Sequence, residues 1–117
     1  MPPQKKCRRV CFIPENREFF PLIDNENKII ITIEEVEAIR LSDLEGMEQT
    51  SAADEMNVSR GTYQRILNSA RFKLGDALIN GKVIIISGGN YEKSSCRGKC
   101  KQCHHCKHRL LQVESNE

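Results

Sequence analysis

The sequence predicts a mainly α-helical domain: a core of three helices, a small β-sheet beside it and a cysteine-rich tail at the C-terminal end. Three observations predict this class. Apolar residues recur at helical spacing between residues 33 and 80, two β-branched runs flank this stretch, and the composition changes to Lys, Ser, Cys and His after residue 89. We therefore divide the chain into residues 1–27, a basic arm with a short strand; residues 28–89, the helical domain; and residues 90–117, the tail.

The composition limits the class of protein. The chain has 117 residues, 5% of them aromatic, and no Trp, so its core is thin and we expect a metal or a partner chain to stabilise it. No apolar run reaches membrane-spanning length, and the basic N-terminus lacks the apolar centre of a signal peptide. We therefore expect a cytoplasmic protein with no membrane partner, in which six cysteines indicate metal or redox chemistry rather than structural disulfides.

The charges are segregated along the chain. Residues 21–58 are strongly acidic, whereas the residues before and after them are basic, and together they give a net charge of only +2. A basic surface beside an acidic one suits a protein that presents one side to a polyanion, although charge alone does not identify a DNA-binding protein.

The first predicted elements are a strand and a loop. The strand runs from Arg8 to Ile13, and Pro14 stops it. The loop that follows, residues 15–27, is polar and turn-rich. It contains an expected apolar patch of Phe19, Phe20 and Leu22.

A second strand leads into the first helix. The β-branched run Ile29–Ile31 predicts the strand, which ends at Thr32. Thr32 opens a capping box with Glu35, because each side chain can bind the backbone N–H of the other residue. The helix is predicted to extend to about Glu45 and to end at Gly46. Its inward side chains are expected to be Val36, Ile39 and Leu44.

The second helix and the turn after it follow a more specific pattern. The helix is predicted over about Gln49–Met56, with Glu48 near its N-cap. Asn57 occupies a turn position that requires a positive φ, and Ser59 is a natural N-cap for the next helix. The small Ala53 marks where the two helices come closest. The expected inward residues are Met56, Val58, Tyr63 and Ile66.

The third helix is the longest, from Arg60 to about Asn80, where Gly81 supplies a left-handed end. The run Lys82–Ser87 then predicts a strand that could pair with Lys28–Thr32 in a small sheet. The apolar stripe of the third helix consists of Tyr63, Ile66, Leu67, Ala70, Leu74, Ala77 and Leu78.

A helix, a tight turn and a second helix over Thr50–Asn68 form the unit that lays a helix in the DNA major groove. The alternative is a plain helical hairpin with a solvated polar surface. Arg can bind guanine, and Gln or Asn can bind adenine, through two hydrogen bonds, and hydroxyls near a helix N-terminus can bind phosphates. The candidate DNA-binding residues are Ser59, Arg60, Thr62, Gln64, Arg65, Asn68 and Arg71, with Lys73 beside Arg71 as a further contact to the phosphate backbone.

Two stretches carry resemblances to known families. The run EEVEAIRLSDLEGMEQTSAADEMNVSRGTYQRILNSARFKLGDALINGK resembles region four of bacterial sigma factors, which reads promoter DNA. From KCRRVCFIPE through INGKVIIISGG, the chain resembles more closely a family of small prokaryotic proteins of unknown function that are predicted to bind DNA. This resemblance implies a sequence-specific DNA-binding regulator, whereas a complete sigma factor would need regions for which the chain has no room. The matching pieces are Lys6–Val10, Glu37–Gly46, Val58–Arg60 and Ser69–Arg71.

Three residues depart from the pattern of that family. Glu48 stands where the family favours Ser, Asn57 where it favours Gly, and Gly61 where Pro often opens the helix. Glu48 and Asn57 can take these roles more weakly. Gly61 costs roughly 1 kcal/mol of helix propensity against Ala, so we expect the first turn to become ordered on DNA.

The tail carries a candidate metal site of four cysteines, Cys96, Cys100, Cys103 and Cys106, with His104, His105 and His108 interleaved. Zinc is the preferred metal. An iron–sulfur cluster, which would make the protein a redox-sensing regulator, and a thiol-rich tail without metal are the alternatives. Cys7 and Cys11 either complete a site with two tail cysteines or are buried, reduced thiols.

The leading hypothesis is a small transcription regulator that binds double-stranded DNA, as a homodimer whose interface uses sheet edges or the β-branched strands. One alternative is a protein-interaction module for the transcription machinery, and another is a redox or metal-trafficking protein centred on the tail. No nucleophile–base pair, phosphate loop or carboxylate dyad is evident, so we expect neither an enzyme nor a small-molecule substrate.

Overall fold

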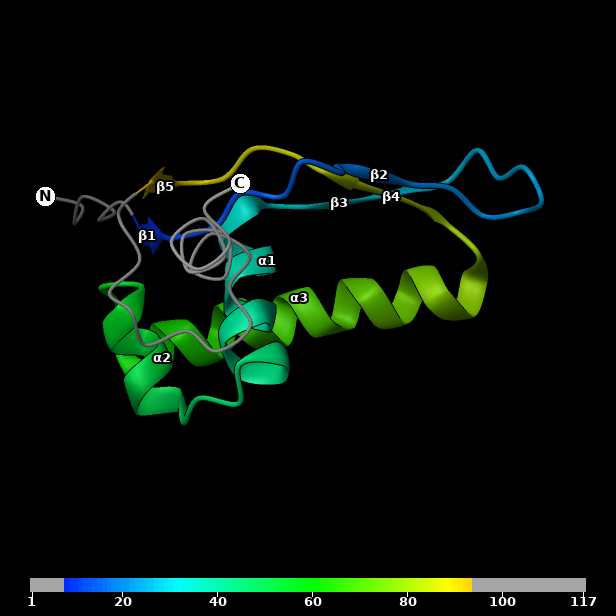
Figure 1. Ribbon diagram of the computed structural model, residues 1–117. Helices are drawn as coiled ribbons and strands as arrows, with labels where there is room; N and C mark the ends of the chain where they lie inside the picture. The colour runs from blue at the N-terminus through cyan, green and yellow to red at the C-terminus, as the bar shows by residue number, and fades with distance from the viewer. Residues whose placement is uncertain (1–7, 94–117) are drawn as a thin grey trace, which may run out of the picture.

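The computed structural model describes residues 8–93 (Figure 1). About half of these residues are helical, and the rest form two small sheets and the loops between them. The predicted arm before Arg8 and the cysteine tail after Lys93 lie outside the described residues. In chain order the elements are β1 (Arg8–Val10), β2 (Glu18–Phe19), β3 (Lys28–Ile31), α1 (Ile33–Ile39), the π-helical segment η1 (Arg40–Leu44), α2 (Gln49–Glu55), α3 (Arg60–Asn80), β4 (Val83–Ile86) and β5 (Tyr91–Lys93).

The larger sheet has the strand order β2-β4-β3. The predicted pairing of the two β-branched runs is confirmed: β3 and β4 are parallel, with Ile29 opposite Ile84 and Ile31 opposite Ile86. Strand β2 pairs antiparallel with the other edge of β4. The sequence did not predict β2, because it consists of two residues within a polar, turn-rich loop.

The smaller sheet joins the two ends of the described chain. Strand β1 pairs in parallel with β5, so that Val10 lies opposite Lys93. The strand predicted from Arg8 to Ile13 is therefore shorter than expected and ends at Val10. Because β1 and β2 pair with strands near the end of the domain, both belong to the same folded unit as the helices.

Helix α1 begins as predicted and ends differently. Thr32 and Glu35 form the full capping box, and Gly46 has a φ of 71°. The last turn widens into η1, in which the Glu45 N–H donates to the Arg40 carbonyl, five residues back. This extra residue shifts the helix phase, so Leu41 fills the core and Leu44 is 58% exposed. The prediction that Leu44 faces inward is wrong.

Helices α2 and α3 and the turn between them lie where the sequence predicts. Asn57 adopts a φ of 58°, and the Ser59 side chain caps α3 by accepting a hydrogen bond from the Thr62 N–H at 3.1 Å. The first turn of α3 is already formed, despite Gly61. Glu48 occupies the N-cap position of α2, but its side chain makes no capping hydrogen bond.

The core forms where the three helices meet. Ala53, whose small side chain predicts a close approach of α2 and α3, is buried in this core. The buried residues of this cluster are Ala38, Leu41, Ala52, Ala53, Met56, Tyr63, Ile66 and Leu67.

The second half of α3 extends beyond α1 and α2 and runs beneath the larger sheet alone (Figure 1). Ala77 is buried there, but Leu78, predicted to be part of the inward stripe, is 76% exposed. This prediction is wrong because a helix covered on one side only buries a narrower stripe than a helix packed between two others.

Candidate nucleic-acid interface

The outward side of the first half of α3 is an exposed polar ridge. Arg60, Gln64, Arg65 and Asn68 are exposed, while Tyr63 and its neighbours on the opposite side are buried in the core. Of the predicted DNA-binding residues, Ser59 and Arg71 are also exposed and Thr62 is half-buried. The fold therefore brings the base-reading candidates together on one continuous surface, which we call the α3 ridge.

Hydrogen bonds organise the start of the ridge. The Thr62 hydroxyl accepts from the Ser59 hydroxyl at 3.0 Å and from the Arg65 guanidinium at 3.3 Å. Thr62 thus holds Arg65 toward the N-terminal end of α3. There the free backbone N–H groups and the helix dipole favour negative charge.

Arg9, which no sequence argument singled out, fixes the turn that precedes the ridge. Its backbone N–H donates to the Met56 carbonyl at 2.9 Å, and its guanidinium donates to the carbonyls of Glu55 and Asp54 at 2.9 and 3.0 Å. A cation bound to the last carbonyls of α2 is favourable for the helix dipole. Its only sequence signal was its place within the family-like piece Lys6–Val10.

Arg71 lies on α3 but is engaged elsewhere. Its guanidinium binds the Asp43 carboxylate at 2.5 and 3.2 Å and the Ser42 hydroxyl at 3.4 Å. The hydrogen bonds that Arg71 donates to the Asp43 carboxylate raise the pKa of Arg71 above its ordinary value. Because Asp43 compensates its charge, Arg71 is less suited to a phosphate than Arg60 or Arg65.

Lys73 is also paired within the fold. Its ammonium group donates to the Glu35 carboxylate at 2.8 Å, and the Ser69 hydroxyl donates to the other oxygen at 2.6 Å. Burial alone would raise the pKa of Glu35, but the hydrogen bonds from Lys73, Ser69 and Thr32 outweigh it and lower this pKa below its ordinary value. Lys73 therefore ties α3 to α1 on the side away from the ridge.

A buried ionic network supports α1 from within. Arg40 donates to both oxygens of Glu37 at 2.7 and 2.8 Å and to Glu45 at 3.3 Å, and the Cys11 N–H donates to Glu37 at 2.9 Å. Much of the acidic charge predicted from residues 21–58 is thus paired inside the fold. The negative field beside the ridge is correspondingly weaker than the formal charges imply.

The predicted metal site belongs to the cysteine-rich tail. Cys96, Cys100, Cys103, Cys106 and Cys7 lie outside the described residues. Among residues 8–93, no group of three or more His, Cys, Asp or Glu side chains could hold a metal ion. Cys11 is buried and follows Val10, whose strand partner is Lys93, so it lies close to the point where the tail begins.

The chain belongs to the family of proteins of unknown function DUF134, which matches residues 1–94. It is 56% identical to a UPF0251 protein of Ruminiclostridium cellulolyticum over 87% of this chain and 80% of that protein. It is also 48% identical to a UPF0251 protein of Caldicellulosiruptor bescii over 88% of this chain and 74% of that protein. No solved structure matches the chain. In the described part of the chain, no helix has both the length and the apolar character needed to cross a membrane.

Proposed function

We propose that this protein is a cytoplasmic transcription regulator that binds double-stranded DNA, with α2, the turn and α3 acting as a helix-turn-helix. The observation that carries the proposal is the α3 ridge, because Arg60, Gln64, Arg65 and Asn68 are exposed on a helix whose opposite side is packed in the core. A helix that enters the major groove must offer such side chains on one outward surface while the rest of the domain holds it from behind.

The chemistry of the ridge suits base reading. A guanidinium such as that of Arg65 can donate two hydrogen bonds to guanine, and the amides of Gln64 and Asn68 can each bind adenine through two hydrogen bonds. Gln64 and Asn68 are four residues apart and lie on the same side of the helix. We therefore assign base contacts to Gln64, Arg65 and Asn68.

Phosphate contacts would supply most of the affinity. The N-terminal end of α3 is exposed, and its backbone N–H groups, the Ser59 hydroxyl and the Arg60 guanidinium can bind phosphate oxygens there. Thr62 orients Arg65 rather than acting mainly as a phosphate donor. Arg71, whose charge is compensated by Asp43, joins α3 to η1 and would make only a weaker contact to a DNA phosphate.

Selection of bound sequences from a random pool of double-stranded DNA tests the proposal. We expect one enriched motif, and an affinity for that motif that falls steeply with salt, by a slope of about −0.9 for each phosphate contact in a plot of log K against log salt concentration. A pool without an enriched motif, together with binding that salt does not weaken, would contradict DNA recognition. That result would favour the interaction module for the transcription machinery.

We also propose that Cys96, Cys100, Cys103 and Cys106 bind a metal, zinc in preference to an iron–sulfur cluster. In the alternative site, Cys7 and Cys11 join two of the tail cysteines. The pairing of Lys93 with Val10 supports this alternative, since it brings residue 93 next to Cys11. A metal there would couple the tail to β1, and β1 holds the turn before the ridge through Arg9.

A further inference from the structure

Phe72 is an exposed aromatic residue near the middle of α3. Its side chain is 75% exposed, although the burial of a phenylalanine normally stabilises a fold. It follows Asn68 by four residues and Arg65 by seven, and side chains at these spacings share one side of a helix. Both of these residues are exposed as well. Phe72 therefore continues the α3 ridge by one further turn, with an apolar group in place of the polar ones.

The two residues that flank Phe72 show in which direction it points. Arg71 binds Asp43 of η1, and Lys73 binds Glu35 of α1. Two residues that are two positions apart lie roughly 200° apart around an α-helix, so α1 and η1 are held on opposite flanks of α3. Phe72, which lies between them in the sequence, therefore points away from α1 and η1 and toward the outside of the domain.

The surroundings of Phe72 favour a nucleic acid over a protein as its partner. Residues 60–75 include four Lys or Arg and no acidic residue, and the first acid of α3, Asp76, is ion-paired with Lys82 at 2.8 Å. One aromatic ring among cationic and amide groups is not the contiguous apolar centre of a protein interface. The DNA major groove offers the complementary pattern, because its base edges bind polar groups and the C5-methyl group of thymine is apolar.

We propose that Phe72 is a specificity-determining residue of the DNA-binding surface, and that its ring packs against the C5-methyl group of a thymine in the major groove. The inference rests on the proposed function, since it adds an apolar base contact to the hydrogen bonds assigned to Gln64, Arg65 and Asn68. Phenylalanine is among the residues whose apolar side chains contact this methyl group in protein–DNA complexes.

The spacing along α3 places the thymine within the DNA site. Given a rise of 1.5 Å per residue, Phe72 lies about 6 Å beyond Asn68, and successive base pairs are about 3.4 Å apart. For a helix that follows the groove, the thymine is thus one or two base pairs from the base that Asn68 binds. The two turns from Arg65 to Phe72 are a usual span for base contacts, which in homeodomains occur at spacings of i, i+3, i+4 and i+7 on one helix.

Replacement of thymine by deoxyuridine tests this contact, because it removes the methyl group and leaves the hydrogen-bonding edge of the base unchanged. Each thymine of the motif selected from the random pool is replaced in turn, and fluorescence anisotropy at fixed salt measures the affinity. We expect one replacement, close to the position at which Asn68→Ala changes the base preference, to weaken wild-type binding roughly fourfold, as for one buried methyl group. The same replacement should leave the affinity of Phe72→Ala unchanged.

Two further variants separate the methyl contact from a general loss of binding. Phe72→Leu keeps an apolar side chain and should retain a weaker response to deoxyuridine. Phe20→Ala removes a similarly exposed ring, 68% exposed, from the loop after β2, and should bind both duplexes as the wild type does. Circular dichroism confirms that each variant retains its helices.

The dependence on salt distinguishes an apolar contact from an ionic one. Phe72 carries no charge, so Phe72→Ala should leave the slope of log K against log salt concentration unchanged. Arg60→Ala, which removes an expected phosphate contact, should reduce the magnitude of that slope by about one.

Three results would overturn the proposal, and they differ in what they leave standing. A wild type that binds every deoxyuridine duplex as tightly as the thymine duplex would refute the methyl contact. A response to deoxyuridine that Phe72→Ala retains in full would assign the contact to another residue. In both cases an enriched motif leaves the proposed DNA recognition intact. A random pool without an enriched motif would instead refute the proposed function together with the role of Phe72.

Discussion

The Tyr63 hydroxyl donates a 2.6 Å hydrogen bond to the Ala38 carbonyl and so joins α3 to α1 at the centre of the core. Both residues are fully buried. The bond sets the rotation of α3 about its own axis, since Gln64 and Arg65, which follow Tyr63 directly, are exposed on the ridge. The orientation of Gln64 and Arg65 thus depends on a contact on the opposite side of the helix.

Removing this hydroxyl should destabilise the fold and change its response to alkali. We expect Tyr63→Phe to lower the free energy of unfolding by about 1–3 kcal/mol, because the Ala38 carbonyl is left buried without its donor. Burial raises the pKa of Tyr63 from 10.0 to about 12. The unfolded chain therefore loses this proton at lower pH than the folded chain, and wild-type stability falls as pH rises from about 10 to about 12.

Urea denaturation at neutral pH and across this alkaline range measures both effects. The alkaline loss attributable to this group should be missing in Tyr63→Phe. Tyr91→Phe, at the half-buried first residue of β5, is the control and should retain the wild-type alkaline response. Equal stability of Tyr63→Phe and wild type at neutral pH would show that the hydrogen bond contributes nothing.

Arg65→Ala should weaken specific DNA binding more than non-specific binding. A lost bidentate contact to a base costs about 1–3 kcal/mol of discrimination, whereas a lost phosphate contact weakens binding to all sequences alike. Fluorescence anisotropy with the selected motif and with a scrambled duplex measures the two affinities. Arg17→Ala removes the same charge from an exposed residue before β2 and should affect neither by as much. Equal losses for both duplexes with Arg65→Ala would assign this residue to the phosphate backbone.

The Glu35 carboxylate should stabilise the fold at neutral pH and cease to do so in acid. Its pKa is lowered below the ordinary value of 4.5 by hydrogen bonds from Lys73, Ser69 and Thr32, which overcome the effect of burial. A lowered pKa in the folded state means that the stabilisation is present above pH 4.5 and is lost as pH falls through the folded value. We expect Glu35→Gln to be less stable than wild type by about 1–3 kcal/mol at neutral pH.

Urea denaturation at neutral pH and at about pH 3 measures this difference, which should shrink in acid. Asp24→Asn, at an exposed carboxylate of the loop before β3, is the control. It should change the free energy of unfolding little at either pH. A difference that persists unchanged at low pH would assign the effect to packing rather than to the charge.

The tail should carry a metal ion. We expect about one zinc ion per chain in protein purified without air, and its loss when Cys100 and Cys103 are both replaced by Ser. Elemental analysis and the visible absorption spectrum distinguish zinc from an iron–sulfur cluster. Protein that contains neither zinc nor iron would contradict the metal site.

Apart from the pairing of β3 with β4, the features that the sequence predicts correctly are local ones. The capping box at Thr32 and Glu35, the positive φ of Asn57 and the N-cap at Ser59 each depend on residues within one turn of each other. The backbone requires particular side chains at such positions wherever the helix lies in the fold. For this reason the bounds of α3 could be predicted without knowing its neighbours.

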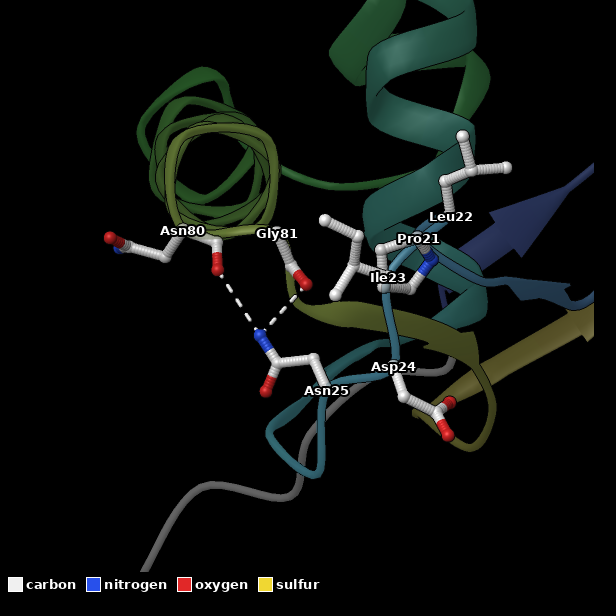
Figure 2. Close-up of a pocket in the computed structure, with 7 residues that line it drawn as sticks. All are labelled: Pro21, Leu22, Ile23, Asp24, Asn25, Asn80 and Gly81. Atoms are coloured by element: carbon white, nitrogen blue, oxygen red, sulfur yellow. Dashed lines mark hydrogen bonds between the residues drawn. The ribbon is translucent and has the colours of Figure 1, made fainter.

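The features that the sequence could not predict depend on distant contacts. Arg9 acts through the end of α2, some 45 residues away. Strand β2 forms because it can pair with the free edge of β4. The exposure of Leu78 follows from how far α1 and α2 extend beside α3. The spacing of apolar residues along α3 does not reveal this length. The hydrogen bonds from the Asn25 side chain to the carbonyls of Asn80 and Gly81 likewise join two segments that only the fold brings together (Figure 2).

The parallel pairing of β1 with β5 has a practical consequence for separating the tail from the domain. Tyr91 packs against the buried cluster of Val10, Ile33 and Ile86, so a chain shortened at the composition change after Gly89 would lose both a strand and part of the interior. A stop codon placed after Lys93 instead removes all four tail cysteines and keeps the pairing of β5 with β1 and the packing of Tyr91. The stability of two such truncated proteins, four residues different in length, should therefore differ far more than their lengths suggest.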